Sequence, residues 1–496
     1  MDGKLIGKLK KDLQPIALIF FIALSNICCN KLVQVPEPIS SVTLSQVFSS
    51  DATATSAVLG IYNNMSITNG FFNLSITTHA GESADELADQ TSGNELNDIF
   101  LSNTLTTFNA NNFSLQYLWQ PAYYDIYCAN SVIAGVEAST GMTTNTKIQL
   151  AGEAKFIRAL CYFYLANLFG DLPLVLSDDF NQTVLLKKSP STQLYQQIIN
   201  DLLDAERTLP GDFALTGGQP IRANRWAAAA LLAKVYLYQE NWSGADSAAT
   251  AVINSGQFSL VPLPVVPLDG FPLGSPLSDS DAFEANSPEA ILQLQSSTQV
   301  YPYTTLEGNF FIVFNSNNTP KMWVTSQLLG AFEPNDLRRL NWLDSAGLGQ
   351  PGGPYYYPYK YKVQTGNPPP ILENITLLRF AEQYLIRAEA EANLNHLGAA
   401  INDLNTIRTR AGLDSIRLPI SQDSVLARVR QENRIEFFAE LGHRWLDLKR
   451  WGLAIDTLRN ISYKRGIDST QLLYPIPTIE LQDDPNLTQN PGYQSY

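Results

Sequence analysis

Histidine is scarce in this chain, which has only His79, His396 and His443 among its 496 residues. A histidine-based metal centre or catalytic triad therefore has little material to build on. Cysteine is nearly as rare, and the four are Cys28, Cys29, Cys128 and Cys161. Because their spacing contains neither a Cys-x-x-Cys pair nor a zinc-ligand pattern, we expect no metal site and no cofactor.

Catalytic motifs are also missing. The sequence contains no Gly-x-Ser-x-Gly, no His-Glu-x-x-His and no Gly-x-x-x-x-Gly-Lys-Thr phosphate loop. A glycosidase would need two carboxylates on either side of a cleft. The acidic run Glu82, Asp85, Glu86 and Asp89 offers carboxylates, but nothing in the sequence pairs them. We therefore assign no catalytic residue and do not expect an enzyme.

Positive charge is in deficit, with 33 Lys and Arg against 47 Asp and Glu and a net charge of −14. A nucleic-acid-binding protein would present a basic face, so this class is excluded. The 45% hydrophobic and 16% charged residues are ordinary for a globular protein that buries a core. Aromatic residues make up 10%, enough to fill that core and to expose rings for flat, uncharged ligands such as sugars.

The N-terminal apolar run, Pro15–Leu24, is too short to span a bilayer comfortably. It follows a lysine-rich start and leads to Cys28-Cys29, the pattern of a bacterial lipoprotein signal that is cleaved before an acylated cysteine. We therefore leave residues 1–28 out of the fold; an ordinary secretory signal with incidental cysteines is the alternative. Residues 29–48 carry prolines and no periodicity, so we expect an extended tether.

Helical patterns occupy residues 49–255 and 375–496, on either side of an insert at 256–374, and we expect one compact body from 49 to 496. The expected helices come in pairs, and small residues recur at a degenerate tetratricopeptide spacing at Ala233, Ala245, Ala388 and Ala400. We predict a mainly α fold of tetratricopeptide-like helix pairs, with a few short β-strands in the loop-rich insert. Such arrays usually scaffold or bind and rarely catalyse.

Two cysteines, Cys128 and Cys161, fall at the same level of one predicted helix pair, 114–138 with 147–169. Packed helices lie about 8–10 Å apart, whereas a disulfide needs Cα atoms within about 7 Å. A disulfide and two buried free thiols therefore both remain open.

Candidate ligand-binding segments are the two that lack helical periodicity. Residues 66–112 are polar and irregular, and a loop of that length is usually functional or disordered. The insert is rich in Pro, Gly and aromatic residues, with short strands predicted at 290–295 and 355–363. Its tyrosines either pack on the helices or face solvent as a stacking platform. The binding residues we select rest on aromatic chemistry in loops, and they are Phe72, Tyr301, Tyr303, Trp342 and Tyr355.

The stretch Gln431–Gly452 is dense in both charges and hydrophobic residues. We predict a helix, a turn at Gly442 and a second short helix. The charges that we expect to form a buried structural clamp are Glu432, Glu436, Arg444 and Arg450. We expect Arg444 to pair with a glutamate of its own or a neighbouring helix. The prolines of 472–493 predict an extended tail.

Three blocks, 151–174, 431–452 and 472–493, resemble the SusD/RagB family of nutrient-binding outer-membrane lipoproteins of Bacteroidetes. The most specific match runs Gly442-His-Arg-Trp-Leu-Asp-Leu-Lys-Arg-Trp-Gly. The resemblance implies a helical body that is tethered by lipid to the outer membrane and faces the outside. It also implies a partner, a TonB-dependent transporter of the SusC type, to which an oligosaccharide or another nutrient is delivered.

The start Cys29-Asn-Lys-Leu resembles the mature N-terminus of that family, so Cys29 is the expected lipid attachment site and Cys28 the alternative. The family's ligand contacts lie in variable loops, so no binding residue carries over from the resemblance. Two other functions remain open. One is a tetratricopeptide-type protein-binding scaffold in the periplasm, and the other is a surface glycosidase.

Overall fold

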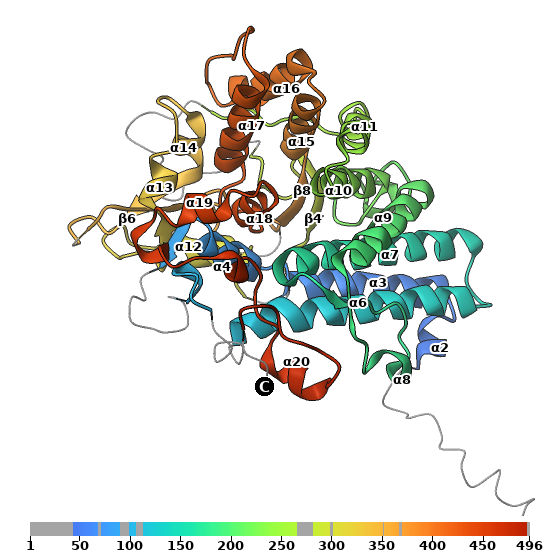
Figure 1. Cartoon of the computed structure of the whole chain (residues 1–496). Helices are drawn as coiled ribbons and strands as arrows, with labels where there is room; N and C mark the ends of the chain where they lie inside the picture. Colours follow the sequence, from blue (N-terminus) through green and yellow to red (C-terminus); the bar gives the residue numbers. More distant parts are fainter. Residues whose placement is uncertain are drawn as a thin grey trace, which may run out of the picture. The chain divides into compact units, whose positions relative to one another are not determined.

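Helices from distant parts of the sequence pack against one another through most of the chain (Figure 1). The computed structural model describes residues 43–67, 71–89, 99–105, 113–264, 281–297, 301–350, 352–366 and 370–493. The predicted signal segment with Cys28 and Cys29, and the tether as far as residue 42, lie outside the described residues. The chain divides into two compact units, Met1–Val47, which contains α2 (Leu44–Val47), and Phe48–Tyr496.

The N-terminal half of the second unit is helical. Its helices are α3 (Asp51–Ser66), α4 (Ser75–Ser83), α6 (Phe113–Ala138), α7 (Thr144–Phe169), α8 (Phe180–Thr183), α9 (Ser191–Thr208), α10 (Arg225–Tyr238) and α11 (Trp242–Ile253). Side chains of Ser50, Thr143 and Asn224 each accept a hydrogen bond from a free N–H in the first turn of α3, α7 and α10. Gly170 ends α7 with a positive φ.

Successive long helices pack against one another, α6 with α7, α7 with α9, α9 with α10 and α10 with α11, and the predicted pair 114–138 with 147–169 is the first of these. The small residues Ala233 and Ala245 are fully buried where α10 and α11 meet, which lets the two helices approach closely. The C-terminal helices continue the array, because α11 also packs against α15. The prediction of a mainly α fold is confirmed.

The C-terminal helices are α15 (Phe380–Asn393), α16 (Leu397–Arg410), α17 (Gln422–Glu436), α18 (His443–Arg450), α19 (Ala454–Leu458) and α20 (Thr478–Asp483). Ala388 and Ala400 lie fully buried in the cluster that joins α15, α16 and α17. The predicted extended tail is wrong in part, since α20 forms directly after Pro477. Proline lacks an N–H but is tolerated where a helix begins, because the first N–H groups have no partner in the helix.

The insert holds short elements, namely β4 (Ala290–Leu294), α12 (Leu306–Phe311), β5 (Met322–Val324), α13 (Ser326–Leu329), α14 (Leu337–Trp342), β6 (Leu343–Ala346), β7 (Tyr355–Pro358) and, just after it, β8 (Ile375–Arg379). With β1 (Leu87–Asp89), β2 (Leu172–Pro173) and β3 (Lys188–Ser189) they form antiparallel two-stranded sheets, β1–β5, β2–β3, β4–β8 and β6–β7. In Figure 1 the insert elements α13, α14 and β6 lie at the opposite side from α7 and α9.

Part of the segment 66–112 that was expected to be an irregular loop is core instead. Residues 75–83 form α4 and residues 87–89 form β1. The acidic residues that the structure describes in this segment are buried, at 1–6% exposure, and they are Glu82, Asp85, Glu86 and Asp89. They are therefore not solvated loop acids available to a ligand.

Two further findings concern sulfur and the membrane. Cys128 and Cys161 are both free thiols. No helix in the described parts of the chain is both long enough and apolar enough to cross a membrane.

Candidate functional site

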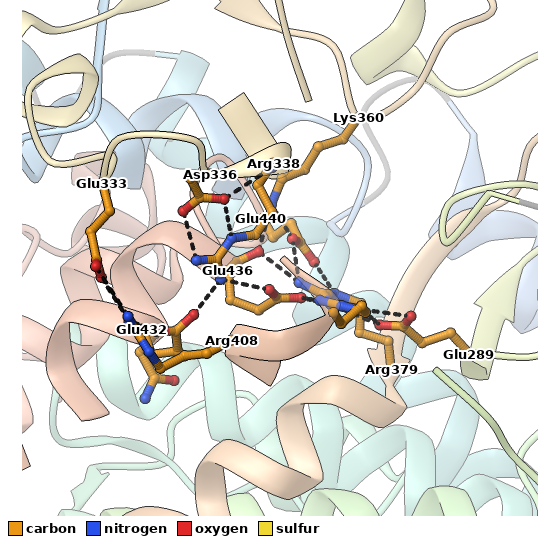
Figure 2. A network of polar contacts seen from close by, with 12 residues as sticks. Glu289, Glu333, Asp336, Arg338, Lys360, Arg379, Arg408, Glu432, Glu436 and Glu440 are labelled. Atoms are coloured by element: carbon orange, nitrogen blue, oxygen red, sulfur yellow. Dashed lines mark hydrogen bonds and ion pairs between the residues drawn. The ribbon is translucent and has the colours of Figure 1, made fainter. Parts of the chain in front are cut away.

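A buried network of ion pairs joins the insert to β8, α16 and α17 (Figure 2). A guanidinium nitrogen of Arg338, in α14, lies 2.6 Å from Glu432 and 3.0 Å from Glu436. Arg379, at the end of β8, lies 2.6 Å from the other oxygen of Glu436 and 3.0 Å from Glu289. Because Glu289, Glu432 and Glu436 each face more than one arginine, the elements that carry them hold one another in place.

Burial and the neighbouring charged side chains together set the pKa values of the groups in this network. Burial by itself would raise the pKa of Glu436, but the guanidiniums of Arg410, Arg379 and Arg338 hold it well below its usual range. Lys360 shows the opposite balance, since burial lowers its pKa to about 8 although Glu440 lies against it. The side chains at the centre of the network, Arg338, Arg379 and Glu436, are at most 2% exposed, which suits a role in fixing the structure.

Two of the predicted clamp residues, Glu432 and Glu436, belong to this network. Arg450 forms separate pairs, with Glu389 at 2.6 Å and with Asp447 at 2.7 Å. The pair with Glu389 ties α18 to α15, whereas Asp447 lies in α18 itself.

Arg444 has a partner that the sequence did not indicate. Its guanidinium contacts Asp85, on the segment between α4 and β1, at 2.8 Å, and Arg434 contacts the other oxygen of Asp85 at 2.6 Å. The prediction that Arg444 pairs with a glutamate of its own or a neighbouring helix is therefore wrong. The carboxylate comes from 359 residues away in the sequence, a distance over which no local pattern links the two side chains.

Two of the five aromatic residues selected from the sequence lie in the core. Phe72 is fully buried and packs edge-on against Phe71, with ring centroids 4.8 Å apart. Trp342 is 1% exposed and packs against Phe283, with the ammonium of Lys360 4.6 Å from its ring. The expectation that Phe72 and Trp342 face a ligand is wrong, because the core already covers their apolar surface.

The other three selected residues lie at the surface of the insert. Tyr301 is 60% exposed, and its ring packs edge-on against that of Tyr303 at 6.3 Å. The ring of Tyr355 lies 4.6 Å from that of Trp323, and both are partly exposed. We call these rings, with one from α12, the aromatic face, and its members are Tyr301, Tyr303, Phe310, Trp323 and Tyr355.

Short strands and one glycine position the rings. Along β5 the buried residues Met322 and Val324 flank the partly exposed Trp323, as expected where alternate side chains point to opposite sides. Tyr355, in β7, lies over Gly347, where an added Cβ would come within 2.8 Å of its ring. Gly347 also has a φ of +74°. Glycine is therefore required both for the turn and for the seating of the ring.

One cation, Lys321, contacts a ring of the aromatic face. The ammonium of Lys321 lies 5.1 Å from the centroid of the Phe310 ring, within the range of a cation–π contact. Hydrogen bonds with the side chains of Thr365 and Asn309, together with the nearby Lys321, lower the pKa of Tyr301. Lys321 therefore lies near two members of the aromatic face, Phe310 and Tyr301. A third member, Trp323, follows it by two residues in the sequence.

Sequence reasoning missed Trp323 and Phe310. The signal for Trp323 was the triplet Met322-Trp323-Val324, in which a ring alternates with aliphatic residues and so points away from the core side. Phe310 gave no such signal, since it precedes another phenylalanine, Phe311, and the helix alone decides which of the two is buried.

A surface groove of about 730 Å³ lies elsewhere, between α16 and residues 260–263. Its walls combine Leu260, Leu263 and Leu337 with polar residues of α16 such as Asn405. Among the described residues, those that line it include no aromatic ring, so it offers no stacking surface. Nowhere in the described ranges are three or more His, Cys, Asp or Glu side chains grouped to hold a metal ion.

Comparison with known proteins places this architecture in a family. Residues 342–493 match a family model described as "SusD family", and residues 44–237 match a second described as "Starch-binding associating with outer membrane". The two models together span more than half of the chain, including the helix pairs and the stretch 431–452. The chain belongs to the SusD family. The resemblance seen in the sequence is confirmed.

Relatives of this SusD-family chain match it over most of their length. SusD-like protein P25 of Formosa agariphila is 24% identical over 97% of this chain and 100% of that protein. Starch-binding protein SusD of Bacteroides thetaiotaomicron is 24% identical over 75% of this chain and 77% of that protein.

Solved structures share the SusD fold. A SusD superfamily protein of Bacteroides vulgatus matches with a TM-score of 0.74 at 23% identity, covering 90% of this chain and 99% of that one. A laminarin-binding SusD-like protein matches with a TM-score of 0.68, also at 23% identity, covering 89% of this chain and 99% of that one. The shared fold therefore takes in about nine tenths of this chain.

Proposed function

We propose that this protein binds an oligosaccharide on the aromatic face of its insert and passes it to a TonB-dependent outer-membrane transporter of the SusC type. In this proposal, acyl groups on Cys29, or on Cys28 as the alternative, hold the body on the extracellular side of the outer membrane. The observation that carries the binding step is the Trp323–Tyr355 pair, two adjoining rings that are both partly open to solvent.

The chemistry around these rings suits a sugar. Sugars stack their C–H faces on aromatic rings, and their hydroxyls need hydrogen-bonding groups at the edge. The polar loop 315–318 lies against Gly347, the residue beneath Tyr355, through a 2.7 Å hydrogen bond from the Gly347 N–H to Ser316. Exposed amides of Asn315, Asn317 and Gln350 lie in the same pair of loops.

The relatives support the choice of a carbohydrate. One matching family model is described as starch-binding and as associating with the outer membrane. Bacteroides thetaiotaomicron SusD is named for starch binding, and one structural relative for laminarin binding. These proteins share the fold that presents the insert, so a glycan is the ligand class that we carry over to this chain.

Binding accounts for the structure better than catalysis does. The acids that a surface glycosidase might use, such as Asp85 and Glu86, are buried, and Asp85 is paired with Arg434 and Arg444. A retaining or inverting glycosidase needs two carboxylates that reach the same sugar. The other alternative, a periplasmic protein-binding scaffold, would account for the helix pairs but not for the exposed rings of the insert.

The test is glycan binding by the purified full chain, with affinity electrophoresis on a panel of polysaccharides. Trp323→Ala and Tyr355→Ala should each weaken binding about tenfold or more, since truncating a central aromatic contact costs roughly 2 kcal/mol. The control is Phe180→Ala, which removes a ring that is 70% exposed on α8 and should leave affinity unchanged.

Equal affinity in the Trp323→Ala, Tyr355→Ala and Phe180→Ala proteins would place binding elsewhere and contradict the proposed site. The transporter step has its own readout. A barrel protein that co-purifies with the acylated chain from outer membranes would support it, and a chain recovered alone under the same mild extraction would count against it.

A further inference from the structure

We infer that the ligand of the aromatic face is an anionic saccharide, one that carries uronate carboxylates or sulfate esters, and that Lys321 recognises its charge. The inference rests on the proposed function, because it concerns the ligand of the same face. It names a ligand class that differs from starch and laminarin, which are neutral glucans.

The first support concerns the charge partners of Lys321. Other lysines contact a carboxylate, among them Lys155, Lys234, Lys360 and Lys362. Lys321 is exposed and forms no ion pair within the parts of the chain that the structure describes. In a chain with 47 acidic and 33 basic residues, an exposed cation that forms no ion pair among the described residues is available to an incoming anion, although Asp89 lies opposite the adjacent Met322 in the β1–β5 pair.

The second support is the position of Lys321. Exposure alternates from Lys321, which is exposed, through buried Met322 to partly exposed Trp323, so the lysine and the indole share the solvent side. The ammonium also lies 5.1 Å from the centroid of the Phe310 ring, and it adds a smaller contribution to the hydrogen bonds with Thr365 and Asn309 that lower the pKa of Tyr301. A sugar stacked on the ring of Trp323 or of Phe310 would therefore have the ammonium beside it.

The third support is energetic. An exposed cation–π contact is worth only about 0.5–1 kcal/mol and leaves the ammonium free to donate hydrogen bonds. A charge-assisted hydrogen bond is roughly twice as strong as a neutral one. An anionic glycan also approaches a protein of net charge −14, and salt screens that repulsion beyond about 8 Å. The net charge itself does not favour an anion, so any attraction has to come from a cation at the point of contact, the role that this inference gives to Lys321.

The experiment compares matched polysaccharides that differ in charge alone. The full chain is titrated with homogalacturonan and its fully methyl-esterified form, a sulfated galactan and its desulfated form, and the neutral glucans starch and laminarin. We expect an anionic member to bind more tightly than its neutral form. Lys321→Gln should weaken that binding roughly tenfold or more, whereas Lys321→Arg should stay within about threefold because the charge is kept. The bound member of the panel distinguishes uronate from sulfate.

The matched control is Arg339→Gln. Arg339 is another exposed cation without an ion pair in the described residues, and it lies 6.0 Å from the Tyr356 ring. Tyr355 and Tyr356 are successive residues of β7, so they point to opposite sides of the strand. Arg339→Gln removes the same net charge away from the aromatic face and should leave binding within about twofold.

The outcomes separate this inference from the proposed function. Binding of a neutral glucan alone, lost in Trp323→Ala but unchanged in Lys321→Gln, would overturn the inference and leave the proposed function standing. Anionic binding that Lys321→Gln and Arg339→Gln weaken equally would also overturn it, since net charge would then be the cause. Binding to no member of the panel would contradict both. Unchanged midpoints of thermal unfolding in all variants would show that a loss of folding does not cause the changes in glycan binding.

Discussion

Glu436 contacts three arginines from three different elements, Arg338 in α14, Arg379 at the end of β8 and Arg410 in α16. Its side chain is fully buried. A buried carboxylate is costly on its own but is stabilised when several guanidiniums surround it. Glu436, in α17, therefore links α14 of the insert to β8 and to α16.

Replacing Glu436 by Gln keeps the shape and removes the charge, which leaves three buried arginines with too few acids. We expect a loss of about 3–5 kcal/mol in the free energy of unfolding, the range for breaking a buried pair, measured by urea denaturation. The control is Lys155→Gln, whose pair with Asp204 is partly exposed and should cost less than about 1 kcal/mol. Equal losses in the two variants would show that the network does not stabilise the fold.

At the residue scale, the sequence predicted which side chains are aromatic or charged but not which way they face. Phe72 and Trp342 were expected at the ligand and lie in the core, whereas Trp323 was passed over and lies at the surface. Aromatic residues fill cores and binding faces alike, so composition does not separate the two. The partner of Arg444 was missed for a related reason, since Asp85 is brought to it by tertiary packing alone.

Gly442 forms the element-scale joint of the C-terminal stretch. It lies between α17 and α18 with a φ of +69°, and an added Cβ would come within 2.6 Å of the Ala80 side chain in α4. The start of α18 therefore packs directly on α4. The sequence predicted this turn, although α17 ends earlier, at Glu436, and leaves Glu440 outside the helix.

Gly442→Ala should destabilise the protein by about 2 kcal/mol or more, because alanine both disfavours a positive φ and meets Ala80. Gly60→Ala is the control. Gly60 lies in the exposed face of α3 with nothing within 4 Å of an added Cβ, so the change should be neutral or stabilising by up to about 1 kcal/mol. Thermal unfolding followed by circular dichroism compares them, and a midpoint for Gly442→Ala at or above that of Gly60→Ala would refute the close packing on α4.

Long elements were predictable from the sequence, and so were the two short strands expected at 290–295 and 355–363, which match β4 and β7. Other short elements were not. The predicted helices at 114–138 and 147–169 match α6 and α7 closely, because periodicity runs over many turns and glycine or capping residues mark the ends of α7. By contrast α4, of nine residues, has a polar sequence that shows no period. The strand β8 was predicted as the start of a helix, since a five-residue apolar run does not distinguish the two.

At the scale of the whole molecule, the protein combines a rigid helical body with an insert that presents aromatic rings. The helix pairs bury small residues such as Ala233 and Ala388 where they meet. The ion-pair network then fixes the insert to that body through Arg338 and Arg379. This arrangement holds the aromatic face on a preorganised surface, so a ligand that binds there pays little to order it.

The most direct test of the central claim is a crystal structure of the full chain with the glycan that binds most tightly in the panel. The account predicts a sugar ring stacked on Trp323 or Tyr355 with carbon contacts of about 4 Å. A glycan held instead in the groove between α16 and residues 260–263, with the aromatic face empty, would contradict it.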